Sequence, residues 1–244
     1  MSPPKTATRR RRSDAGMVHL TARDGAALAW IGEQYAVRAD VAAMVLARHS
    51  QRTAGLSRRT TRVQLDRWER AGLVLRERLY GRLWVVPTAA GLAFAGLPYG
   101  PWRPAWSRLA HVHAVSVVRL ALEAEHPGLA WIGERALARE RHQQRGGWHL
   151  PDGAVEVPPP PGSTLLRALH AIEVELTPKS RLNLAEVFRR LPGNVVAVTY
   201  LAPAGDLGAL RVAVAELAAG RRPPLQVRVL ELPRVAGLTY EGDR

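Results

Sequence analysis

Two glutamates and a lysine lie close together in the stretch EVELTPKS, where Glu173 and Glu175 are two residues apart and Lys179 follows. Residues two apart in a strand point to the same face of a sheet, so both carboxylates are expected on one face. About twenty residues earlier, the stretch HLPDGAVEV supplies Asp152 at the start of another expected strand. If these two strands pair as a hairpin, Asp152 and Glu173 converge.

Two converging carboxylates and a backbone carbonyl form a hard-oxygen site suited to Mg²⁺, with Mn²⁺ as a substitute. A water molecule bound to such a metal can attack a phosphodiester, and a nearby ammonium group would orient that water or stabilise the developing negative charge. The alternative is that Glu173 and Glu175 are ordinary solvent-exposed residues and that Lys179 pairs with one of them. Lys5 and Lys179 are the only lysines among 35 basic residues, so Lys179 stands out.

The histidines are less informative. His111 and His113 are two apart on an expected helix and therefore face different directions, which is poor spacing for metal ligands. His149 precedes the Pro-Asp pair and is close enough to touch the site, but we interpret it as a structural or solvated residue.

The net charge points to a polyanionic partner. The 244 residues carry a formal net charge of +14, with a pI near 11.4. No basic amphipathic helix with bulky apolar anchors is present, which favours nucleic acid over a membrane surface. No apolar run approaches the roughly 18 residues that cross a bilayer, and the basic N-terminal stretch lacks the apolar core of a secretory signal. We therefore expect a cytoplasmic, globular, DNA-binding protein with no membrane partner.

The chain is long enough for about two domains. We expect a flexible basic arm over residues 1–18, whose run Arg9–Arg12 could lie along phosphates. The other expected parts are a first domain over 19–95, a linker over 96–106, a second domain over 107–233 and a C-terminal tail over 234–244. Each domain has its own apolar periodicity, so we expect residues 19–95 to fold alone.

Residues 19–95 have the pattern of a winged helix-turn-helix. Thr21 and Asp24 predict the start of a first helix, and a third helix over SRRTTRVQLDRWERAG is expected to carry Val63, Leu65 and Trp68 inward and to stop at Gly72. A β-hairpin around Tyr80-Gly81 follows.

The third helix and the hairpin supply the expected DNA contacts. In a helix-turn-helix, the N-terminal turns of the recognition helix meet base edges in the major groove, and arginine pairs with guanine and glutamine with adenine. The hairpin would lie along phosphates or in the minor groove. The alternatives are a solvated arginine-rich helical face and a protein-binding winged helix. The expected DNA-binding residues are Arg58, Arg59, Thr61, Arg62 and Gln64 on the helix and Arg76, Arg78 and Arg82 on the hairpin.

Residues 107–233 begin with an apolar-striped helix and then alternate between short strands and helices, which favours an α/β or α+β domain with a mixed sheet. The order helix, strand, strand, strand, helix, strand, with PD and later E-x-E, resembles the PD-(D/E)xK nuclease fold. With the winged helix in front, residues 20–231 resemble the replication-relaxation family of plasmids and mobile elements. The matching pieces are LTARDGAALAWI, LDRWERAGLVLRERLYGRLWVVPTAAG, AHVHAVSVVRL, WIGERALARE, PDG and EVELTPKS.

The resemblance implies roles for individual residues. Asp152 and Glu173 match metal-binding carboxylates, and Glu134 is a further metal ligand of the kind such nucleases take from a helix. Glu175 occupies the usual lysine position, so Lys179 would be a displaced lysine, although Pro178 should end the strand before it. The catalytic set is then Asp152, Glu173, Glu175 and Lys179, with Mg²⁺ bound by Asp152, Glu173 and Glu134.

Two classes of function remain open. The first is a DNA-binding protein that acts in the replication, conjugation or transfer of a mobile element, with metal-dependent nicking of DNA. The second is a non-catalytic DNA-binding regulator or adaptor, whose nuclease-like domain mediates dimerisation or recruits a partner. The expected partner is double-stranded DNA, and the further candidates are a second copy of the chain in a homodimer and replication or transfer proteins.

Overall fold

The structure is a computed structural model that describes residues 19–50, 55–103, 105–220, 225–238 and 240. The expected basic arm and the last residues of the tail lie outside these ranges. The described residues form a mixed α+β fold with eight α-helices, a three-stranded sheet and a five-stranded sheet. No helix in these ranges combines the length and the apolar composition needed to span a bilayer.

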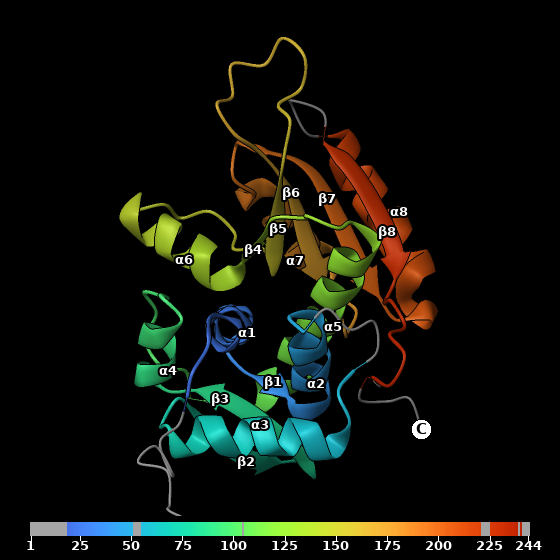
Figure 1. Cartoon of the computed structure of the whole chain (residues 1–244). Helices are drawn as coiled ribbons and strands as arrows, with labels where there is room; N and C mark the ends of the chain where they lie inside the picture. The colour runs from blue at the N-terminus through green and yellow to red at the C-terminus, as the bar shows by residue number, and fades with distance from the viewer. Residues whose placement is uncertain (1–18, 51–54, 104, 221–224, 239, 241–244) are drawn as a thin grey trace, which may run out of the picture.

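The N-terminal elements form three helices and a hairpin, followed by a short fourth helix (Figure 1). The three-stranded sheet has the order β1-β3-β2, and both pairings are antiparallel. The elements are α1 (Ala22–Glu33), β1 (Val37–Arg38), α2 (Ala39–Arg48), α3 (Arg58–Arg70), β2 (Val74–Leu79), β3 (Arg82–Pro87) and α4 (Ala89–Phe94).

Local signals set the ends of these elements, as the sequence predicts. The Thr21 side chain accepts from the Asp24 backbone N–H, and the Asp24 carboxylate accepts from the Thr21 N–H, which completes a capping box. Ser57 caps α3, and Gly72 follows that helix with a φ of 70°. The hairpin turns at Tyr80 and Gly81, which both have positive φ, as a two-residue turn of the primed type requires.

The C-terminal elements build the five-stranded sheet, in the order β4-β5-β6-β7-β8. The pairings β4–β5 and β5–β6 are antiparallel, and β6–β7 and β7–β8 are parallel. The elements are α5 (Leu109–Glu125), β4 (Trp131–Gly133), α6 (Glu134–Gln143), β5 (Gly153–Val157), β6 (Ala168–Val174), α7 (Arg181–Arg190), β7 (Val195–Ala202), α8 (Leu207–Ala219) and β8 (Gln226–Glu231).

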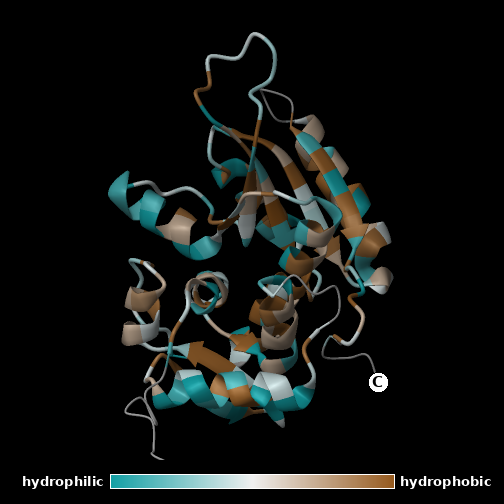
Figure 2. Ribbon diagram, in the orientation of Figure 1, coloured by the Kyte–Doolittle hydropathy of each residue, from teal (hydrophilic) through white to brown (hydrophobic). Residues whose placement is uncertain are grey.

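Helices cover both faces of this sheet. Ala114, Val115 and Val118 of α5 pack against Ile172 and Val174 of β6 on one face. On the other face, α7 and α8 form a second apolar cluster with β6 and β7, in which Phe188 stacks on Tyr200 with ring centroids 6.2 Å apart. Figure 2 shows the hydropathy of each residue. In the N-terminal half, α3 is predominantly hydrophilic, and the neighbouring β3 is hydrophobic.

The helix α5 contributes residues to the apolar clusters of both halves of the chain. Val117 and Leu120 of α5 join the apolar cluster of α1, α2 and α3. Leu109 and Val112 join a second cluster with Trp84 of β3. The proline- and glycine-rich stretch 96–106 therefore separates the halves along the chain but does not divide the apolar core.

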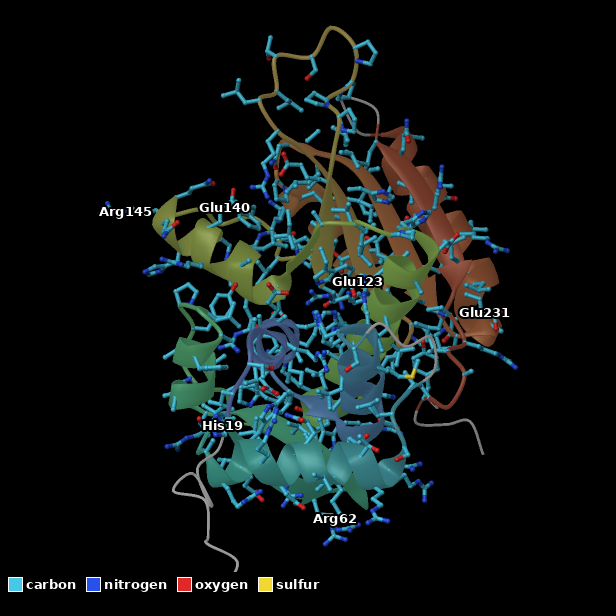
Figure 3. All side chains as sticks on the ribbon, in the orientation of Figure 1. His19, Arg62, Glu123, Glu140, Arg145 and Glu231 are labelled. Atoms are coloured by element: carbon cyan, nitrogen blue, oxygen red, sulfur yellow. The ribbon has the colours of Figure 1, made fainter. Side chains whose placement is uncertain are left out.

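Buried polar contacts also join the halves at α5. Trp30 of α1 donates its indole N–H to Glu123 Oε2 at 2.9 Å, and Arg48 of α2 pairs with the same carboxylate. Arg119 bonds Glu123 Oε1 at 2.8 Å and pairs with Glu33 at 2.6 Å. Figure 3 shows Glu123 between the N-terminal helices and the large sheet.

Candidate functional site

The outer face of α3 carries exposed cations. Arg58, Arg59 and Arg62 are all exposed, and the side chain of Arg62 is 81% accessible, with only a 3.9 Å approach to Asp66. Figure 3 shows Arg62 pointing away from the rest of the protein. Two neighbours that the sequence analysis did not select, Thr60 and Val63, are exposed on the same helix.

Val63 was expected in the core and is instead 60% exposed. The buried positions of α3 are Thr61, Leu65 and Trp68, which follow the spacing i, i+4, i+7. Because successive helical residues are separated by about 100°, Val63 lies about 200° from Leu65 and cannot share its face. The spacing alone would therefore have excluded Val63 from the buried stripe.

Two of the expected base-reading side chains make contacts within the protein instead. Thr61 is buried, and its hydroxyl donates to the Ser57 carbonyl at 3.0 Å. Gln64 donates its amide to Asp24 Oδ1 at 2.7 Å, and Trp68 donates to the same oxygen at 2.9 Å. Arg67 is ion-paired with Asp24 as well. These side chains fasten α3 onto α1 and so fix which face of α3 is turned outward.

The three hairpin arginines differ in their environments. Arg76 lies between Asp66 Oδ1 at 2.6 Å and Glu69 Oε2 at 2.8 Å, and the hydrogen bond to Glu69 raises the pKa of the guanidinium. Arg78 and Arg82 are exposed. Of the eight residues predicted to bind DNA, five are therefore turned outward: Arg58, Arg59, Arg62, Arg78 and Arg82.

The carboxylates of the second half do come together, through the hairpin pairing that the sequence predicts. Gly153 of β5 pairs with Ile172 of β6, which places Asp152 beside the end of β6. There Asp152 Oδ2 accepts the backbone N–H of Val174 at 2.7 Å. Glu173 and Glu175 are only 2% and 6% exposed, so they are not solvent-exposed residues.

Each of these carboxylates already has a basic partner. His111 Nε2 lies 2.6 Å from Asp152 Oδ1, and His149 Nε2 lies 2.8 Å from Glu173 Oε1. Lys179 pairs with Glu175, as the alternative interpretation of the sequence expected. Arg108 pairs with Glu134 at 2.9 Å. The sequence analysis missed His111 as a member of the site, because no local signal connects a residue of α5 to one 41 positions later.

Burial and pairing shift the acidities in this cluster. Burial raises the pKa of Glu173 to about 7, although the hydrogen bond with His149 acts in the opposite direction. Burial also raises the pKa of Glu175 against the effect of Lys179. Burial would lower the pKa values of His111 and Lys179, but their bonds to Asp152 and Glu175 outweigh it and raise both.

The arrangement does not fit the predicted Mg²⁺ site. Within the described ranges, no group of three or more His, Asp or Glu side chains is placed to hold a metal ion. Glu134 lines a small pocket with His111 and Asp152 but is ion-paired with Arg108. Glu173 is bonded to His149. Each of these three carboxyl groups thus already has at least one oxygen in a hydrogen bond with another side chain.

Tyr200 is a further member of the cluster that the sequence analysis missed. It pairs with Glu173 across β6 and β7 and is completely buried. Burial and the charge of Glu173 raise the pKa of its hydroxyl, which has no hydrogen-bond partner among the described residues. A buried hydroxyl without a hydrogen-bond partner is energetically costly, so Tyr200 places an unsatisfied polar group beside the carboxylates.

No family model, curated protein or solved structure matches the chain in comparisons with known proteins.

Proposed function

We propose that this protein binds double-stranded DNA through α3 and the β2–β3 hairpin, as a winged helix-turn-helix. One observation carries the proposal: Arg58, Arg59 and Arg62 occupy the outward face of α3, while the polar residues of its other face are bonded to Asp24. The recognition helix of a helix-turn-helix protein presents such a face to the major groove.

The order and charge of the chain support this proposal. The order of α1, β1, α2, α3, β2 and β3 is that expected for a winged helix, with the hairpin in the position of the wing. Arg78 and Arg82 project from this hairpin toward solvent. The net charge of +14 favours association with a polyanion.

We further propose that the protein acts in the replication or transfer of a plasmid or another mobile element, which rests on the family resemblance of the sequence. In this proposal the second half is a non-catalytic, PD-(D/E)xK-like domain that supports the DNA-binding half or recruits a partner. The pairing of every carboxylate in the cluster with a basic side chain favours this role over metal-dependent catalysis.

Selection from a randomised duplex library tests the DNA-binding proposal. The full-length protein should enrich a defined sequence, and its affinity should fall steeply with salt because arginine–phosphate contacts release counterions. Enrichment of no sequence, together with salt-independent retention of DNA, would refute it. The control is the Arg58→Gln, Arg59→Gln, Arg62→Gln triple variant, which should enrich no sequence.

A second candidate function, a metal-dependent nicking endonuclease, is favoured by the convergence of Asp152, Glu173 and Lys179. Asp152 and Lys179 are both close enough to Glu173 to influence its ionisation. Nicking of supercoiled plasmid with Mg²⁺ or Mn²⁺ decides between the candidates. Activity that is lost in Asp152→Asn and Glu173→Gln but kept in Glu231→Gln would establish the nuclease. The proposed function predicts no nicking by the wild-type protein under either metal.

A further inference from the structure

A second pocket lies on the large sheet, where His170 points to the opposite face of β6 from Glu173. It has a volume of about 100 Å³ and is lined by His170 of β6, Ala197 and Val198 of β7, and Gln226 and Arg228 of β8. His170 pairs with Ala197, and Ala197 pairs with Gln226, so these residues form one row across three strands. The next row brings Thr199 beside Arg228.

The helix α5 leaves this row open. Side chains two apart on a strand share a face, so His170 is on the same face as Ile172 and Val174. The apolar cluster with α5 contains Ile172 and Val174 but not Ala197, the apolar pocket residue that pairs with His170. The two β8 side chains of the pocket, Gln226 and Arg228, are exposed.

A β-bulge adjoins the pocket. Leu169 pairs with Val195 and His170 with Ala197, so β7 contains an extra residue, Val196, at this point. A bulge changes the direction in which nearby side chains point, and bulges are frequent beside functional sites. The irregularity lies between Leu169 and His170, so it directly precedes the pocket residues His170 and Ala197.

The side chains of the pocket supply donors but no carboxylate. The guanidinium of Arg228 makes no hydrogen bond or ion pair with any residue that the structure describes. His170 Nε2 lies 2.8 Å from Thr199 Oγ1, which fixes the ring beside the arginine. Burial and the charge of Arg228 lower the pKa of His170, so the site holds one permanent cation and a neutral imidazole at neutral pH.

We propose that His170, Thr199, Gln226 and Arg228 bind a phosphate group. A guanidinium fork takes two oxygens of an oxyanion, and phosphate has further oxygens that can point at the imidazole and the amide, whereas both oxygens of a carboxylate already face the fork. The pocket is smaller than the roughly 300 Å³ at which cavities begin to enclose whole small ligands, so it accepts the phosphate group and leaves the rest of the ligand outside.

This site is independent of the proposed DNA-binding face. Figure 1 shows α3 at one end of the molecule and the loop between β5 and β6, next to the pocket, at the other. The phosphate can come from a nucleic-acid strand or from a small molecule. Because the pocket and α3 use different arginines, either proposal can fail while the other holds.

An NMR titration of the histidine side chains in the full-length protein tests the proposal. The probes are inorganic phosphate, thymidine monophosphate, a short single-stranded oligonucleotide and acetate, all at equal ionic strength. A bound phosphate group, free or carried by one of the nucleotide probes, should shift the His170 signals saturably and raise the pKa of His170 by about one unit, because its negative charge offsets the charge of Arg228. The exposed ring of His142 on α6 is the internal reference.

Two variants complete the test. Arg228→Gln should weaken phosphate binding about tenfold or more, because it removes a charge-assisted pair. Arg189 is an exposed residue of α7, so Arg189→Gln removes the same charge and should leave the titration unchanged. A response to the oligonucleotide alone identifies a strand as the source, and a response to all three phosphates identifies a general phosphate site. An unmoved His170, an equal response to acetate, or an equal loss in Arg189→Gln would overturn the proposal.

Discussion

Trp68 of α3 donates its indole N–H to Oδ1 of Asp24 on α1, at 2.9 Å. Gln64 bonds the same oxygen, and Arg67 is ion-paired with it, so one buried carboxylate holds three side chains of α3. Burial raises the pKa of Asp24, but the hydrogen bonds from Trp68 and Thr21 outweigh it and lower the pKa below its usual range. The orientation of the proposed recognition helix therefore depends on this carboxylate.

Replacement of Asp24 should destabilise the fold. Asp24→Ala leaves Trp68, Gln64 and Arg67 without their acceptor, and loss of one partner from a buried ion pair costs about 3–5 kcal/mol. Urea unfolding at neutral pH measures the change. The control is Glu231→Ala, at an exposed residue of β8, which should cost less than about 0.5 kcal/mol. Because the folded pKa is lowered, this stability should be present at neutral pH and vanish as the pH falls through the folded pKa. Equal stability of the two variants at neutral pH would contradict the role of Asp24.

Unfolding of the whole protein should be one cooperative transition. Val117 and Leu120 of α5 lie in the apolar cluster of the N-terminal helices, and Glu123 bonds both Trp30 and Arg48. Calorimetry should give one transition, which Glu123→Ala shifts as a whole to lower temperature. Two separate transitions in the wild type, only one of which moves in the variant, would show that the halves unfold independently.

Glu173 should make the protein less stable as the pH rises. Its folded pKa of about 7 exceeds the ordinary value of 4.5, so between these values the folded state keeps a proton that the unfolded state has lost. Stability should therefore decline between about pH 4.5 and pH 7, by up to about 3 kcal/mol for this group, and Glu173→Gln should flatten the decline. Urea unfolding at both pH values measures the effect. A carboxyl carbon of Glu173 that titrates near pH 4 would refute this account.

Lys179 should be replaceable by arginine but not by methionine. Its ammonium pairs with the carboxylate of Glu175, which is almost fully buried, while Lys179 itself is one-third exposed. Lys179→Met should cost about 1–2 kcal/mol, a value reduced by solvent around the ammonium, and Lys179→Arg should cost less than half as much. Thermal unfolding of both variants gives the comparison. An arginine variant as unstable as the methionine variant would indicate a need for the amine itself.

Local patterns predicted much of the fold. The Thr21 cap, the turn at Tyr80-Gly81 and the convergence of Asp152 with Glu173 all follow from residues that are near in sequence or from one hairpin register. The contacts of α5 could not be predicted in this way. Its apolar stripe is compatible with packing on either half, and only the folded arrangement shows that His111 reaches Asp152 and that Glu123 reaches Trp30.

The most direct test of the central claim compares two variants of equal charge in duplex binding by fluorescence anisotropy. One carries Arg58→Gln, Arg59→Gln and Arg62→Gln on α3. The other carries Arg139→Gln, Arg181→Gln and Arg189→Gln, which are exposed arginines of α6 and α7.

If the outward face of α3 contacts DNA, the first variant should lose affinity about tenfold or more for the selected duplex. The slope of its log affinity against log salt concentration should become less steep by roughly 0.9 for each phosphate that the variant no longer neutralises. The second variant should stay within about twofold of the wild type, since it loses only long-range attraction. Equal losses in the two variants would show that the affinity follows the net charge, and would contradict the assignment of α3 as the DNA-binding face.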